Sequence, residues 1–337
     1  MQGIDLARQF AWVIACNNNL GYEDGAVFVK NFYSGSRAIR DPAVLQHLES
    51  APTVIELLHQ HDAIEHFQSL FGPWLLANRH NTIQGLDQFV PDISQGATQA
   101  FDSFFLRYAD HRITFLQGEY FYHVLSAQYL NRPYACINDY TVLGHRDLLV
   151  LSWPFCDTGS TPDHAEQILD HCDRVGIPVL LDCAYFPLAQ GIHLNLNHDS
   201  IKIVAFSLSK TFPVAHARIG MRYVRSEIMD GQRLHSNINY DNRISAGLGL
   251  HIIECFDSDY ISVKYQKLSQ LLSQSLGLVS SQSVIFADGD QTWSMFGRKG
   301  LLDTYGLDMD YRLFRNRICI TALLENKDLI CKVLEHL

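Results

Sequence analysis

The chain has 337 residues, of which 47% are hydrophobic and 18% charged, a balance typical of globular proteins and not of disordered chains. Its formal net charge of −10 argues against nucleic acid or an anionic membrane as a main partner. No apolar run reaches the roughly 18 residues of a membrane helix. The apolar stretch at 10–16 is short and follows only Arg8, so we also expect no cleaved secretory signal.

The cysteines and histidines do not form a metal-binding or disulfide pattern. No pair of cysteines has the C-x-x-C spacing, and several cysteines lie inside apolar stretches, such as Cys183 and Cys319. Three histidines, His59, His61 and His66, read as surface residues of one helix, because no carboxylate or cysteine pattern completes a closed site. We therefore predict buried, reduced thiols in a cytoplasmic protein without a metal.

In chain order, the central part alternates segments typical of strands and helices. Strands are predicted at 112–117, 147–154, 177–182 and 200–207, and helices at 123–131 and 161–176. The second helix opens with Thr-Pro and closes on Gly176, a common C-terminal stop. The next strand is a continuous apolar run, as expected when both faces of a sheet are covered. This alternation predicts an α/β domain with a mostly parallel sheet.

The character of the sequence changes after about residue 240. We predict helices at 244–256 and 263–278, a hairpin over 283–298 turning at Asp288-Gly289, a strand at 317–323 and a closing helix at 325–337. These elements indicate a smaller α+β unit. We expect a large domain over 46–240 and a small domain over 241–337, with residues 1–45 forming an arm and part of the small domain.

Polar residues follow the predicted strands where an open α/β sheet binds its ligands. Asp182 ends one strand, Ser207, Ser209 and Lys210 follow another, and a turn at 96–98 enters a helix. A helix N-terminus with hydroxyls suits a phosphate, and a lysine can form an imine with an aldehyde. An aspartate can hold a protonated ring nitrogen. Pyridoxal phosphate has all three features.

Each of these residues taken alone has an ordinary structural explanation. A strand-end aspartate such as Asp182 is commonly a helix N-cap, and Arg218 alone would be a surface charge. Ser207 and Ser209 could simply cap a turn, and Tyr120 could belong to the core. The functional interpretation depends on all of them occurring together, in the right order and at workable spacings.

The motifs also resemble a known family, the class I/II aminotransferases, which form the aspartate-aminotransferase-like branch of fold type I PLP-dependent enzymes. The matching stretches are QGATQAF, EYFYH, LSWPFCDTGS, VLLDCAYFPLA, SLSKTFPVAHARIGMRYV and RICITA, spread over about residues 25–337. The most specific one is Ser-x-Ser-Lys with Arg218 eight residues after Lys210. The resemblance implies a PLP-dependent transferase fold, a free amino acid as substrate, and a homodimer with shared active sites.

The resemblance also implies roles for the strand-end residues. Lys210 would form the Schiff base with the cofactor, and its free amine would later move the substrate proton as general base and acid. Asp182 would pair with the pyridinium nitrogen. Tyr185 would hydrogen-bond the phenolic oxygen of the cofactor.

Further residues would hold the cofactor and the substrate. Tyr120, or its near neighbour Tyr122, would stack on the cofactor ring, with Ala184 on the other face. The phosphate would be held by Gly96, Ala97, Thr98, Ser207, Ser209 and Arg218. Arg317 would form a two-pronged pair with the substrate carboxylate, and Gly35 would border the substrate.

One position departs from the family. Cys156 stands where the family has an asparagine that hydrogen-bonds the phenolic oxygen, and a thiol is a weak donor. We predict amino transfer to a 2-oxo acid as the reaction. The alternative is a PLP-dependent lyase, decarboxylase or oxidase/cyclase of a specialised amino-acid biosynthetic pathway. A third, from another class, is a catalytically silent binding module.

Overall fold

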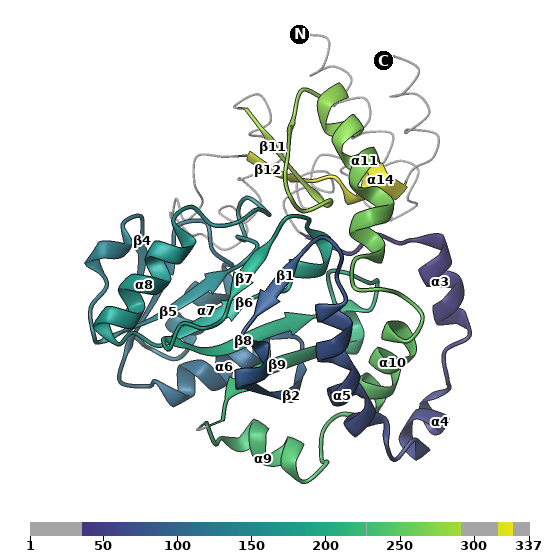
Figure 1. Ribbon diagram of the computed structural model, residues 1–337, viewed down its shortest axis with the longest axis horizontal. Helices are drawn as coiled ribbons and strands as arrows, with labels where there is room; N and C mark the ends of the chain where they lie inside the picture. Colours follow the sequence, from purple (N-terminus) through teal and green to yellow (C-terminus); the bar gives the residue numbers. More distant parts are fainter. Residues whose placement is uncertain (1–35, 227, 291–315, 326–337) are drawn as a thin grey trace.

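The computed structural model describes residues 36–226, 228–290 and 316–325, and it is built around a seven-stranded sheet (Figure 1). β9 runs antiparallel to both of its neighbours, and the other pairs are parallel. The predicted α/β class with a mostly parallel sheet is therefore confirmed. In spatial order the strands are β2 (Phe89–Gln95), β9 (Ile219–Arg225), β8 (Ile201–Ser207), β6 (Val179–Asp182), β5 (Asp147–Ser152), β3 (Arg112–Leu116) and β4 (Tyr134–Ile137).

Helices cover both faces of this sheet, which explains its continuous apolar strands. Along β5, Leu148 and Val150 face one hydrophobic cluster while Leu149 and Leu151 face the other, because successive side chains of a strand alternate. The first cluster is closed by α6 (Ala97–Arg107) and α7 (Tyr122–Tyr129). The second is closed by α5 (Ala63–Leu76), α8 (Ala165–Val175) and α10 (Arg243–Ile253).

Most elements of the central region lie where the sequence predicts them, within a few residues. α8 ends on Gly176, whose φ of 77° is left-handed, so glycine suits this stop. Strands β2 and β9 were not predicted. They pair with each other over their full lengths and make the antiparallel part of the sheet.

A smaller unit lies above the sheet in Figure 1. It contains an antiparallel sheet of β10 (Val279–Ser280), β11 (Phe286–Gly289) and β12 (Asn316–Cys319), with α11 (Tyr260–Ser275) and α14 (Thr321–Glu325). The predicted turn at Asp288-Gly289 is wrong, because both residues pair with β12 inside β11. The predicted strand at 317–323 ends at Cys319 and continues as α14. Residues 291–298 and 326–337 lie outside the described part, and the domain division stays a prediction.

The remaining elements flank the large sheet. β1 (Thr82–Gln84) and β7 (His193–Asn195) form a parallel pair. The helices are α3 (Pro42–Glu49), α4 (Val54–His59) and α9 (Gly231–Asn237), and α4 begins with a capping box between Thr53 and Glu56. Over the described residues, no helix has both the length and the apolar character needed to cross a membrane.

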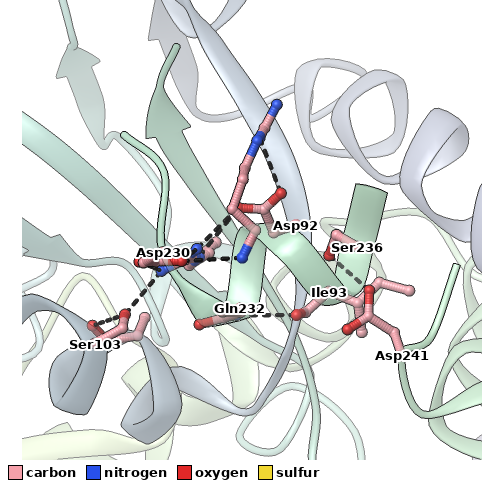
Figure 2. A network of polar contacts seen from close by, with 10 residues as sticks. Asp92, Ile93, Ser103, Asp230, Gln232, Ser236 and Asp241 are labelled. Carbon is pink, nitrogen blue, oxygen red and sulfur yellow. Dashed lines mark hydrogen bonds and ion pairs between the residues drawn. The ribbon is translucent and has the colours of Figure 1, made fainter. Parts of the chain in front are cut away.

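A buried charge network joins β2, β9 and α9 (Figure 2). The Arg222 side chain is fully buried and pairs with Asp92 at 3.1 Å and Asp230 at 2.6 Å. It also donates a hydrogen bond to Ser103 at 2.8 Å, and Arg233 donates to Asp92 at 2.9 Å. Burial raises the pKa of Asp92, although both arginines favour its charged form. The charged forms of Arg222 and Asp92 are therefore stabilised by the ion pairs that these residues make with each other and with their neighbours.

We expect Arg222→Met to lower the free energy of unfolding by about 3 kcal/mol, because it leaves two carboxylates without their central partner. Urea unfolding followed by circular dichroism measures this change. Arg146→Met, at an exposed position, is the matched control and should stay within about 0.5 kcal/mol of the wild type. Equal midpoints for the two variants would contradict the prediction.

Candidate active site

A cavity of about 400 Å³ opens beyond the carboxyl ends of the parallel strands. The register of the strands brings the residues of its wall together, because Asp182 pairs with Ser152 of β5 on one side and with Ala205 of β8 on the other. Ala205 lies two residues before Ser207. Most of the predicted site residues line this cavity. They are Ala97, Thr98, Tyr120, Cys156, Asp182, Ala184, Tyr185, Ser207, Ser209, Lys210, Arg218 and Arg317. Gly35 lies outside the described residues.

One corner of the cavity is built to receive an anion. Arg218 donates a hydrogen bond to the Thr98 hydroxyl at 3.0 Å, next to the N-terminus of α6. The hydroxyls of Ser207, which ends β8, and of Ser209, in the turn that follows, lie 3.0 Å apart. A helix N-terminus with a guanidinium and hydroxyls is a phosphate-binding arrangement.

Gly96 allows Arg218 to approach this helix end. Its φ of 71° and ψ of −177° belong to a region that is nearly reserved for glycine. A Cβ atom at this position would lie 2.5 Å from Nη2 of Arg218. The predicted phosphate role of Gly96 therefore has a steric basis, although Gly96 does not itself line the cavity.

The cavity also contains a buried acid and a buried base. Burial raises the pKa of Asp182 to about 6. A hydrogen bond from the Ala184 N–H and the charge of Lys210 both act to lower this pKa. Burial lowers the pKa of Lys210, while Cys319, Cys156 and Asp182 oppose that shift. A cationic ring nitrogen would keep Asp182 ionised, and a lowered pKa makes the lysine a better nucleophile.

Ser36 is a site residue that the sequence analysis did not single out. Lys210 Nζ donates a hydrogen bond to the Ser36 carbonyl at 2.9 Å, and the Ser36 and Tyr185 hydroxyls lie 2.8 Å apart. Burial raises the pKa of Tyr185, which keeps this phenol protonated. Ser36 directly follows Gly35 in the stretch that resembles the substrate-bordering turn, and that was the available signal.

Two tyrosines stand on the aromatic side of the cavity. Tyr120 and Tyr122 both line it, with ring centroids 5.9 Å apart and planes 16° from parallel. The Tyr122 hydroxyl donates to Asp102 at 2.7 Å, which ties this ring to α6. Tyr120 is 43% exposed, and its hydroxyl makes no such hydrogen bond to another described residue. We therefore favour Tyr120 as the stacking residue.

Arg317 and Cys156 meet on the side nearest the small unit. Arg317 is buried, donates to the Cys156 carbonyl, and lies 3.7 Å from its sulfur. Its guanidinium also lies 4.4 Å from the centre of the Phe286 ring. Cys156, where the family has an asparagine, thus contacts the residue predicted to bind the substrate carboxylate.

These residues fit pyridoxal phosphate. The anion corner suits its phosphate, Asp182 its ring nitrogen and Lys210 its aldehyde, and all three open on one cavity. The described residues contain no cluster of histidine, cysteine and carboxylate that could hold a metal ion.

Comparison with known proteins gives the class first. The aspartate aminotransferase of Thermus thermophilus, a double mutant, superposes with a TM-score of 0.62 at 14% identity, covering 90% of this chain and 89% of that one. A probable N-succinyldiaminopimelate aminotransferase from the same organism gives 0.62 at 14%, covering 99% and 100%. The PLP-bound C-S lyase of Staphylococcus hominis gives 0.61 at 12%, covering 94% of each. The chain therefore has the fold of fold type I PLP-dependent enzymes.

The family comparison is consistent with that class. Residues 137–276 match the family described as aminotransferase class I and II. This confirms the predicted resemblance, and the chain carries an enzyme domain of this type, whose cofactor is pyridoxal phosphate. A search of curated proteins finds no match to this sequence.

We predict that Gly96→Ala weakens the binding of pyridoxal phosphate roughly tenfold, since each 1.4 kcal/mol of strain or lost contact corresponds to that factor. The added methyl group would displace the Arg218 guanidinium and strain the backbone. Absorbance titration of the cofactor measures the dissociation constant. Gly144→Ala is the control, because a Cβ there meets no atom within 4 Å, and unchanged affinity in Gly96→Ala contradicts the proposed phosphate corner.

Proposed function

We propose that this protein is a PLP-dependent enzyme that acts on a free amino acid and transfers its amino group to a 2-oxo acid. The observation that carries the proposal is the joint placement of Lys210 and Asp182 beside one cavity, with Arg218 at its anion corner. Asp182 ends β6, whereas Lys210 and Arg218 lie between β8 and β9, and the pairing of β6 with β8 brings these two parts of the chain together.

Bound pyridoxal phosphate supplies an electrophilic aldehyde and an electron-withdrawing ring. In the proposed reaction, Asp182 stays ionised against the ring nitrogen and so keeps the ring electron-poor. Lys210 Nζ would take the proton from the substrate Cα and deliver it to the carbon that was the aldehyde of the cofactor, and the lowered pKa of Lys210 favours this role. Arg317 holds the substrate carboxylate, and its contact with Cys156 fixes the guanidinium close to that place.

A second function, elimination or another PLP-dependent outcome, is favoured by one observation. Cys156 lines the cavity in place of the family's asparagine, so a weak donor faces the predicted position of the phenolic oxygen. The similar fold of the C-S lyase agrees with this alternative, but that likeness concerns the fold alone. We take the pathway of either reaction to be biosynthetic.

The assembly and location are further proposals. We propose a cytoplasmic homodimer with shared active sites, by resemblance to the family. Leu234 and Ile238 of the α9 region, with Tyr240, are exposed by more than half and offer an apolar surface for a second copy. Light scattering of the purified protein should give twice the monomer mass, and a monomer at micromolar concentration would refute this assembly.

We expect the wild type to be yellow, and borohydride to fix pyridoxal phosphate covalently on Lys210. Lys210→Ala should lose this attachment completely, because Lys210 is the one lysine among the described residues that line the cavity. Mass spectrometry of the reduced, digested protein locates the modified residue. Lys202→Ala, on the same strand, is the control and should keep the modification. A colourless wild type that takes up no added cofactor would contradict the proposed function.

A panel of free amino acids distinguishes the two reactions. Transamination should leave pyridoxamine phosphate on the enzyme in the absence of a 2-oxo acid, detected by chromatography after denaturation. Release of ammonia, carbon dioxide or peroxide with the cofactor intact would favour the second function instead.

Arg317→Met should raise the amino-acid concentration needed for half-maximal rate by about 100-fold, as expected when a charge-assisted pair with the substrate carboxylate is lost.

A further inference from the structure

Glu119 is a buried carboxyl in the cavity wall for which the proposed function has no role. It lies in the loop after β3, only 2% of its surface is exposed, and it is among the residues that line the cavity. An acid in such a place needs hydrogen-bond donors around it, because burial of an uncompensated charge is costly. The contacts of Glu119 are therefore informative.

The Glu119 carboxyl accepts three hydrogen bonds from two residues, Ser152 and Tyr120. Its Oε1 accepts from the Ser152 N–H at 2.6 Å, and its Oε2 accepts from the Ser152 hydroxyl at 2.7 Å. Oε2 also accepts from the N–H of Tyr120 at 3.2 Å. Ser152 ends β5 and Tyr120 follows β3, so one carboxyl joins the ends of two adjacent parallel strands.

The chain of contacts continues to Cys156. The Ser152 hydroxyl accepts a hydrogen bond from the Cys156 N–H at 2.7 Å. Glu119 thus lies between the residue we favour for ring stacking, Tyr120, and the thiol that contacts Arg317. Both ends of this hydrogen-bond chain open on the cavity, while Glu119 and Ser152 form its buried middle.

A backbone hydrogen bond also connects this chain of contacts to the end of a third strand, β6. The Trp153 N–H donates to the carbonyl of Asp182 at 2.9 Å, directly after Ser152. The charge of Asp182 on β6 acts on Glu119, and Glu119 in turn helps to raise the pKa of Cys136 on β4. Tyr120, Cys156 and Lys210 are further titratable side chains of the same cavity wall. Burial raises the pKa of Glu119 to about 8, against the hydrogen bonds of Ser152, and the charge of Asp182 raises it further.

We propose that Glu119 is a positioning residue of the cofactor site, and that its carboxyl holds the Tyr120 backbone directly and the Cys156 backbone through Ser152, so that both residues are placed against the cofactor ring. This inference rests on the proposed function. Glu119 itself does not contact the reacting atoms. Its effect is to fix the aromatic wall and the Cys156 loop in one mutual geometry, which is what a bound planar ring requires.

The test uses Glu119→Gln and Ser152→Ala in the full chain. The test is made above the Glu119 pKa of about 8, where the carboxyl is ionised. There, Glu119→Gln replaces one acceptor oxygen by a donor, so at least one of the three donors loses its partner, and Ser152→Ala removes the hydroxyl that links Glu119 to Cys156. Each should raise the dissociation constant of pyridoxal phosphate about tenfold. The dissociation constant of the double variant should not exceed the larger of the two single-variant constants, because both substitutions act on one hydrogen-bond chain.

A matched control separates positioning from general stability. Asp173 accepts a hydrogen bond from the Ser200 N–H at 2.7 Å, at the start of β8 and so at the opposite edge of the sheet. Asp173→Asn is the same carboxyl-to-amide change far from the cavity. It should lower the melting temperature of the cofactor-free protein while leaving the cofactor dissociation constant unchanged.

A spectroscopic readout gives a second measure. The visible circular dichroism of bound pyridoxal phosphate should change in both site variants, since the band reports the asymmetric surroundings of the ring.

The outcomes are distinct. If Glu119→Gln and Ser152→Ala bind the cofactor with the wild-type constant and band, the inference is wrong even when both are less stable. If Glu119→Gln does not fold, Ser152→Ala alone decides by the same criterion. If the wild type binds no pyridoxal phosphate, the proposed function fails first and the inference with it.

Discussion

The register between β5, β6 and β8 is the constraint on which the rest of this site depends. It sets Ser152 beside Asp182, and Asp182 beside Ala205, so that the side chains after each strand end meet at one edge. A shift of one residue would turn Asp182 to the opposite face of the sheet. The register is held by two apolar clusters, because alternate residues of each strand are buried against helices on opposite faces.

The antiparallel strand β9 adds a second constraint to the first. It returns from β8 through the turn that carries Ser209 and Lys210, and Arg218 stands immediately before it in a left-handed conformation, with φ of 53°. β9 then pairs with β2, which leads into Gly96 and α6. Arg218 and the helix end that it contacts are therefore brought together by the pairing of β2 with β9. The buried Arg222 network lies on the same two strands (Figure 2) and stabilises this pairing at a distance from the cavity.

Electrostatics in the cavity follow from its depth. Burial raises the pKa values of Asp182 and Glu119 and lowers that of Lys210, so each of these groups is less charged there than in water. A bound cation and anion would reverse part of these shifts. Such a site is suited to a cofactor with a cationic ring and an anionic phosphate, and this physical match supports the proposed function independently of the motifs.

The class of fold and the residues with local motifs could be predicted from the amino-acid sequence alone. Lys210, Asp182 and Arg218 could be predicted because each follows a strand or turn at a short, fixed spacing. The structure decided what depends on contacts between distant segments, namely Ser36 against Tyr185, Arg317 against Cys156, and Glu119 against Ser152. The turn predicted at Asp288-Gly289 failed for the same reason, since pairing with β12 keeps both residues in a strand. Local spacing fixes which groups follow a strand, but only the packing of strands and helices fixes which groups those side chains meet.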